Sequence, residues 1–250
     1  MPKRSHRANR QIKRNITGYL GSGKPDSAGA VAALFHILAA LIAILLPLSL
    51  MTLAAGIVLR VPDLMSFEID RSGVLQEFGV DATPDEVADE ISGYLRHKKD
   101  SLELTTQVAH KDVPVFSFMD EVNLDRIRAL LDKALYPSIG ALALSAALFA
   151  IALLAGRRRH LTRAMRASAA IYACAACFTL ALALHPPLRE AVFSWQPGVD
   201  FSGGGLLPRL FGGLYPILSA GMSCLVSFII YITLYSVARR LAAEKETMFR

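Results

Sequence analysis

Four long stretches without a charged residue constrain this sequence most strongly. An apolar α-helix needs about 20 residues to cross roughly 30 Å of hydrocarbon. The charge-free stretches cover residues 28–59, 134–156, 167–184 and 210–238. They predict an all-α integral membrane protein with four transmembrane helices.

The composition agrees with this class. The chain of 250 residues is 53% hydrophobic and 19% charged, with a mean hydropathy of +0.40, whereas a soluble domain averages about 25% charged residues. Its three cysteines are too few for a disulfide-stapled secreted module. The first apolar stretch is far longer than the roughly 7–15 apolar residues of a signal peptide, so we expect a retained helix.

The basic residues predict the orientation. Lys and Arg crowd the segments 1–27, 157–166 and 239–250, which alternate correctly around four helices for all three to be cytoplasmic. Segments 60–133 and 185–209 are then extracytoplasmic, and both termini lie inside. The excess of basic residues behind the net charge of +6 is therefore explained by the orientation in the membrane. We expect these residues to contact anionic membrane lipid. We expect no nucleic acid partner, because the basic residues flank membrane helices without a binding motif.

The segment 60–133 is long enough for a small extracytoplasmic cap of α-helices and a β-hairpin. Thr83 to Glu86 has the pattern of a capping box, with Pro84 at the first helical position. Residues 102–105 and 113–116 flank a polar turn, which favours a short hairpin. Ser117 can cap a further helix that runs into the second span.

Two motifs suggest cofactor or metal sites but have simpler interpretations. Residues 18–24 have the spacing of a phosphate-binding loop, yet Pro25 follows where that loop needs Ser or Thr. A flexible linker is the expected structure. Cys174 and Cys177 have no other metal ligands near them in the sequence. We expect buried, reduced cysteines and no metal site.

His185 is the most informative histidine. It follows the third apolar stretch and precedes two prolines, which predicts an imidazole at the outer interface beneath the cap. A neutral imidazole near pH 7 is the usual general base, although a capping role at the helix end fits the position as well. The glycines at 203–205 and 212–213 either surround an oxyanion with N–H groups or bend the outer loop into a helix.

The order of these parts resembles a known family. The specific pieces are Phe116-Ser117 before a helix containing residues 123–131, Leu214-Tyr215-Pro216 at the fourth span, and Met248-Phe249 near the end. Together with a basic tail, four spans and a cap after the first span, they resemble the lipoprotein intramolecular transacylase family of bacterial four-helix membrane proteins.

This resemblance implies an acyl shift at the outer face of a bacterial plasma membrane. An ester-linked acyl chain on the glycerol of a lipoprotein's modified cysteine moves to that cysteine's own α-amino group. Membrane lipid and lipoprotein N-termini are the implied partners, and no cofactor is required.

The resemblance also implies site residues. The family's cap-helix histidine is replaced here by Asn123, and the Asp-Val that follows it in the family is replaced by Arg126-Ile127. A second family histidine, placed before a tryptophan, corresponds to His185, or in another register to Glu190. The implied catalytic residues are His185 and Asn123. The implied substrate-binding residues are Arg126, Glu190, Trp195 and Tyr215.

Two functions follow from these matches and mismatches. The first is an acyltransferase with His185 as base. The second is a non-catalytic relative whose cap binds a lipid, a lipoprotein or a partner membrane protein, because an asparagine cannot act as a base near pH 7.

Overall fold

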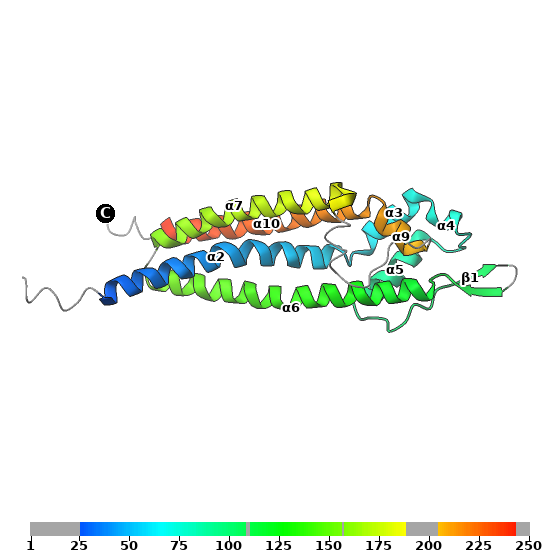
Figure 1. The fold of residues 1–250 in the computed structure, drawn as a ribbon, viewed down its shortest axis with the longest axis horizontal. Coiled ribbons are helices and arrows are strands. Elements are labelled where there is room, and N and C mark those ends of the chain that lie inside the picture. The colour runs from blue at the N-terminus through cyan, green and yellow to red at the C-terminus, as the bar shows by residue number, and fades with distance from the viewer. Residues whose placement is uncertain (1–25, 109–110, 157, 189–204, 244–250) are drawn as a thin grey trace, which may run out of the picture.

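The computed structural model describes residues 26–108, 111–156, 158–188 and 205–243. In this part of the chain, four long helices form an elongated bundle (Figure 1): α2 (Asp26–Val58), α6 (Phe118–Leu154), α7 (Arg158–Leu184) and α10 (Tyr215–Ala243). Each is long and apolar enough to cross a membrane. The predicted all-α membrane fold with four spans is confirmed.

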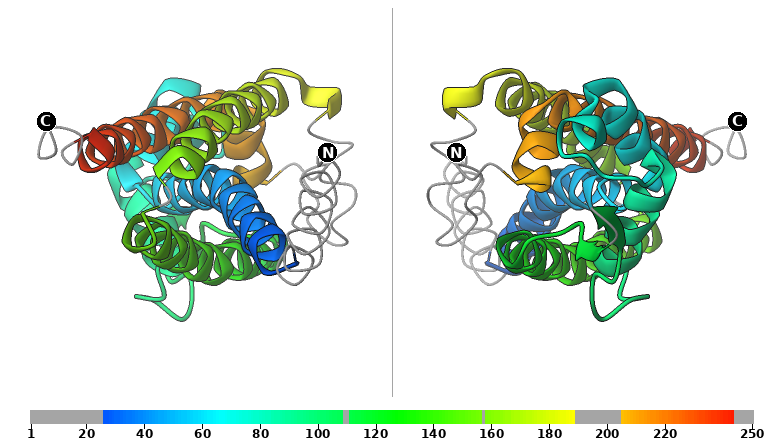
Figure 2. Two further views of the ribbon diagram at one scale, coloured as in Figure 1. Left: turned by 90° about the vertical axis from the view of Figure 1, so that its left-hand side faces the viewer. Right: turned by 90° about the vertical axis from the view of Figure 1, so that its right-hand side faces the viewer.

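Helix α2 lies at the centre of the bundle and packs against the other three long helices. Figure 2 shows α6 on one side of α2, with α7 and α10 on the other. Tyrosine hydroxyls join α7 to α10: Tyr172 donates to the Cys224 carbonyl (2.8 Å) and Tyr231 donates to the Met165 carbonyl (3.1 Å). Such hydrogen bonds help to hold helices together where lipid supplies no hydrophobic driving force.

Three helix boundaries differ from the sequence-based expectation. Residues 158–166, expected as a loop, form the first turns of α7, and α10 continues beyond residue 238 to Ala243. The fourth span, expected from residue 210, begins only at Tyr215, because Leu206–Gly212 form a separate short helix. Arginine, leucine, alanine and methionine are strong helix formers, and they favour helix on either side of the bilayer boundary. The charge-free windows therefore locate the hydrocarbon and not the helix ends.

The cysteines also differ from the expectation of burial. Cys174 and Cys177 are exposed on the bundle surface, and Cys224 is half-buried; all three are free thiols. In a membrane helix, a small weakly polar side chain is able to face lipid, so an apolar stretch does not predict burial within the protein.

A small cap lies at one end of the bundle (Figure 1). It comprises α3 (Pro62–Ser72), α4 (Val74–Glu77), α5 (Pro84–Leu95), the antiparallel pair β1 (Thr105–Val108) and β2 (Lys111–Pro114), and the first turns of α6. The short helix α9 (Leu206–Gly212) packs against α3 and α4. That this end faces outward stays a prediction.

The cap has a hydrophobic core shared with α9 and the start of α10. Val87, Ile91 and Leu124 lie at its centre and are fully buried. The hairpin strands pair Thr105 with Pro114 and Val108 with Lys111. The two strands lie nearer the turn than the expected 102–105 and 113–116. Leu102 and Phe116 are not paired in the hairpin, because their side chains are buried in this core.

Both predicted helix caps are present. The Thr83 Oγ1 accepts the Glu86 N–H (3.3 Å), and the Glu86 carboxylate accepts the Thr83 N–H (2.8 Å). Ser117 and Asp120 form the same reciprocal pair at the start of α6. Each pair satisfies backbone donors that a helix start leaves without intrahelical partners.

The capping box at the start of α5 makes the stability of the folded protein depend on pH. The Thr83 backbone N–H and then its hydroxyl hold the pKa of the Glu86 carboxyl below its ordinary value. A lowered pKa gives stability that is complete above the unfolded-state pKa and is lost as the pH falls through the folded-state pKa. We expect Glu86→Gln to lower the Tm of the purified chain at pH 7 and to remove this part of the acid-dependent loss. Asp89→Asn, at an exposed carboxylate on the same helix, is the control; equal effects of both changes would contradict the prediction.

Candidate functional site

The junction between the cap and the membrane helices contains a buried carboxylate. Glu68 on α3 is only 1% exposed. Its Oε1 accepts the Leu214 backbone N–H (2.8 Å), and its Oε2 accepts the Arg71 Nε–H (3.1 Å). A Cβ on Gly213 would lie 2.2 Å from this Oε1. The start of α10 is thus held directly against α3, at a place that only glycine fits.

Tyr215 ties the same junction to the end of α2. Its ring is fully buried and contacts Phe211 edge-on, with the ring centroids 5.3 Å apart. Its hydroxyl donates to the Leu59 carbonyl (3.1 Å). The structure therefore gives this residue a partner within the protein, and the substrate-binding role implied by the resemblance stays a prediction.

The start of α6 provides a second buried polar group beside α9. Asp120 accepts the Ser117 N–H through Oδ2, and its Oδ1 faces Gly205, where a Cβ would lie 2.8 Å away. Asn123 follows nearly one turn later and is only 2% exposed. The amide that replaces the family's cap histidine therefore lies inside the protein.

Two of the other implied site residues lie on the described ends of α7 and α6. His185 is exposed, and its backbone N–H donates to the Ala181 carbonyl (3.0 Å) as the last turn of α7 closes. Arg126 is exposed on α6. Glu190 and Trp195 lie outside the described residues.

His185 follows the end of α7, and Asn123 lies near the start of α6. The helices that carry them lie on opposite sides of α2 (Figures 1 and 2). The pairing of these two residues in one site therefore stays a prediction.

A polar cluster that the sequence reasoning missed lies where α5 meets α6. The Asp132 carboxylate accepts Arg60 Nη2–H (2.6 Å) and contacts His97 Nε2 (2.7 Å). Arg128 donates through Nε to His97 Nδ1 (3.0 Å) and stacks over the Tyr94 ring, 4.9 Å from its centroid. Both imidazole nitrogens are engaged, so His97 holds the cap to α6 and is not an available base.

The sequence contained one indication of this cluster. Arg60 is the first residue of the predicted cap, and Asp132 lies directly before Lys133, its last residue. Both therefore lie close to the ends of charge-free stretches, where opposite charges are able to pair. Nothing in the sequence indicated that His97 would adopt a left-handed backbone conformation, with φ of 58°, that turns its ring toward them.

The described residues contain no group of three or more His, Cys, Asp or Glu side chains that is able to hold a metal ion.

The fold is similar to that of solved membrane proteins, while no family model and no curated protein matches the sequence. Structures of the membrane integral lipoprotein intramolecular transacylase Lit from Bacillus cereus superpose on this chain. A variant with a histidine-to-arginine substitution gives a TM-score of 0.67 at 16% identity, covering 90% of this chain and 99% of that one.

Two further structures of the same protein agree. One gives a TM-score of 0.64 at 15% identity, over 86% of this chain and 99% of the other. A histidine-to-alanine variant gives 0.63 at 17% identity, over 89% and 100%. The resemblance inferred from the sequence is confirmed at the level of the fold.

Proposed function

We propose that this chain catalyses an intramolecular acyl shift on lipoprotein N-termini at the outer face of a bacterial membrane. The observation that carries the proposal is the extent of the structural match, which includes 99–100% of the transacylase chains. A bundle alone is a common architecture, but this match extends over the whole length of those chains.

The proposed reaction needs little from the protein. The cysteine α-amine attacks the ester carbonyl of the same molecule, an amide C–N bond forms and the ester C–O bond breaks. The proton lost by the amine ends on the released glycerol oxygen, so no co-reactant is consumed. Because amine and ester belong to one molecule, positioning supplies much of the rate. A base and donors toward the tetrahedral oxyanion supply the rest.

His185 is the base in this proposal. Three observations support it: the side chain is exposed, it lies at the end of a membrane-spanning helix, and it forms no ion pair or side-chain hydrogen bond within the described residues. An ester at the glycerol level of a lipid lies at the same interface. Asn123 is proposed as a positioning residue for the oxyanion side. Arg126, Glu190 and Trp195 remain proposed contacts of the lipid and the lipoprotein, whereas the fully buried Tyr215 is proposed to act only by positioning the start of α10.

The burial of Asn123 favours a second candidate, a non-catalytic protein whose cap binds a lipid or lipoprotein. An amide cannot take the proton of the amine near pH 7, and at 2% exposure it is enclosed by the protein. If the chain is an enzyme, Asn123→Ala lowers turnover by about tenfold or more, as loss of an oxyanion-side donor does. If it is only a binder, no turnover exists to lose. Asn123→Asp, which keeps the shape, shows whether folding explains the loss.

Mass spectrometry of lipoprotein N-terminal peptides tests the proposed function. The peptides come from cells that lack all such transacylases, with and without this chain expressed. Appearance of N-acyl, monoacylglyceryl cysteine in place of diacylglyceryl cysteine is the expected result. An unchanged lipopeptide profile, with the protein detected in the membrane fraction, would reject the enzyme and leave the binder, which crosslinking from the cap would then test.

A further inference from the structure

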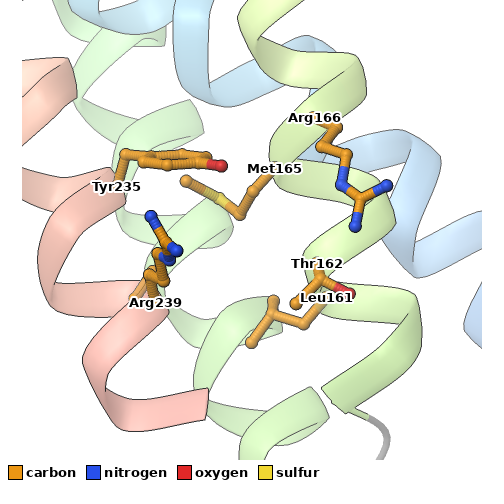
Figure 3. A pocket seen from close by; sticks show the side chains of 7 residues that line it. Leu161, Thr162, Met165, Arg166, Tyr235 and Arg239 are labelled. Atoms are coloured by element: carbon orange, nitrogen blue, oxygen red, sulfur yellow. The ribbon is translucent and has the colours of Figure 1, made fainter. Parts of the chain in front are cut away.

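A pocket of about 320 Å³ lies at the end of the bundle opposite the cap, between α7 and α10. Its polar rim carries Arg166 and Thr162 from α7 and Arg239 and Tyr235 from α10, and its apolar floor consists of Leu161, Met165 and Ala238. Figure 3 shows the Tyr235 hydroxyl and Met165 between the two arginines, one on each helix. The volume is within the range of small-ligand sites.

The two arginines mark the level of the membrane interface. Arg166 is the last charged residue before the charge-free stretch 167–184, and Arg239 is the first after the stretch 210–238. Both guanidinium groups therefore lie where the hydrocarbon ends and the phospholipid phosphates begin. In the apolar floor, Met165 and Ala238 are adjacent in sequence to the two arginines and lie at the edge of the hydrocarbon, whereas Leu161 lies more than one turn of α7 further from the charge-free stretch.

The charge of the two arginines is not neutralised within the described structure. Neither forms an ion pair with a described residue, and neither α7 nor α10 contains an aspartate or a glutamate. Both side chains line the same pocket, so an anion bound there is attracted by two positive charges. Guanidinium groups match phosphate oxygens in geometry as well as in charge.

We infer that this pocket binds the phosphate of an anionic phospholipid, with Arg166 and Arg239 on the phosphate and with Met165 and Ala238 against the start of the acyl chains. Basic pockets between membrane helices are known sites for such headgroups. The site lies at the opposite end of α7 from His185, so it is separate from the proposed outer site and independent of it.

The test compares two double variants of the full chain that change net charge equally. Arg166→Gln with Arg239→Gln alters the pocket, whereas Arg163→Gln with Arg240→Gln alters exposed arginines on the same helices that do not line it. Native mass spectrometry in detergent measures binding of phosphatidylglycerol, with phosphatidylcholine of the same acyl chains for comparison. We expect the pocket variant to lose about tenfold or more of its phosphatidylglycerol affinity, and the control variant to lose far less.

Three results would overturn the inference. One is an equal loss in both double variants, which would indicate only a diffuse basic surface. Another is equal binding of phosphatidylglycerol and phosphatidylcholine. The third is saturable binding of inorganic phosphate that displaces the lipid at similar concentration, which would assign the pocket to a soluble phosphate compound. If the double variant does not fold, the same binding measurement is made on the single variants Arg166→Gln and Arg239→Gln, both of which change exposed side chains.

Discussion

Alanine in place of Gly213 is expected to destabilise the protein by about 2–4 kcal/mol, because it removes a buried charge-assisted hydrogen bond and adds steric strain. The new Cβ would lie 2.2 Å from Glu68 Oε1, the atom that accepts the Leu214 N–H. Glu68 is 1% exposed and has little room to move. Displacement of the Glu68 carboxylate would break its hydrogen bond with the Leu214 N–H and leave both buried groups without this partner.

Gly212→Ala is the matched control, since a Cβ there meets nothing within 4 Å. Thermal unfolding of both variants in the same detergent measures the difference. The cause is the contact and not the backbone, because Gly213 has an ordinary φ of −80°. A Gly213→Ala protein as stable as the Gly212→Ala protein would show that Glu68 does not hold the start of α10.

Replacement of His185 by alanine is expected to lower the acyl shift by about 10²–10⁴-fold, the usual contribution of a general base. The side chain is exposed at the end of α7, so its loss removes no core packing and the protein is expected to keep its Tm. Lipopeptide mass spectrometry over a time course measures the conversion rate.

The neighbouring Leu184→Ala serves as control, because this side chain is 62% exposed on the same helix end. It is expected to keep the wild-type conversion rate. Unchanged conversion in the His185→Ala protein would remove His185 from the mechanism and direct attention to Glu190, its alternative in the family register. Equal loss in both variants would indicate that the helix end, rather than the imidazole, is required.

Local sequence patterns predicted those parts of the fold that depend on neighbouring residues. The Thr83–Glu86 capping box and the Ser117 cap are complete within four residues, and both formed as expected. The four charge-free stretches predicted the spans because the hydrocarbon excludes charge over a fixed thickness. The start of α7 at Arg158 was not predicted, because helix propensity continues where the apolar window ends.

The candidate site could be predicted only as a set of residue types. His185 was located at a helix end from its place after an apolar stretch, and the structure agrees. The burial of Asn123 and Tyr215 was not predicted, because it depends on packing between distant parts of the chain: α10 contacts α3 and α9, and α6 contacts α5. The engagement of both His97 nitrogens likewise depends on Arg128 and Asp132, more than 30 residues away.

Four membrane spans and a helical cap after the first of them could be predicted from the amino-acid sequence, because hydrocarbon thickness and helix capping act on consecutive residues. Which polar groups are buried, which are paired and which cations share a pocket depends on how the helices pack. Glu68 meets Leu214, and Arg166 faces the same space as Arg239, across 146 and 73 positions of sequence respectively. Contacts at such separation follow from helix packing, which no local pattern encodes.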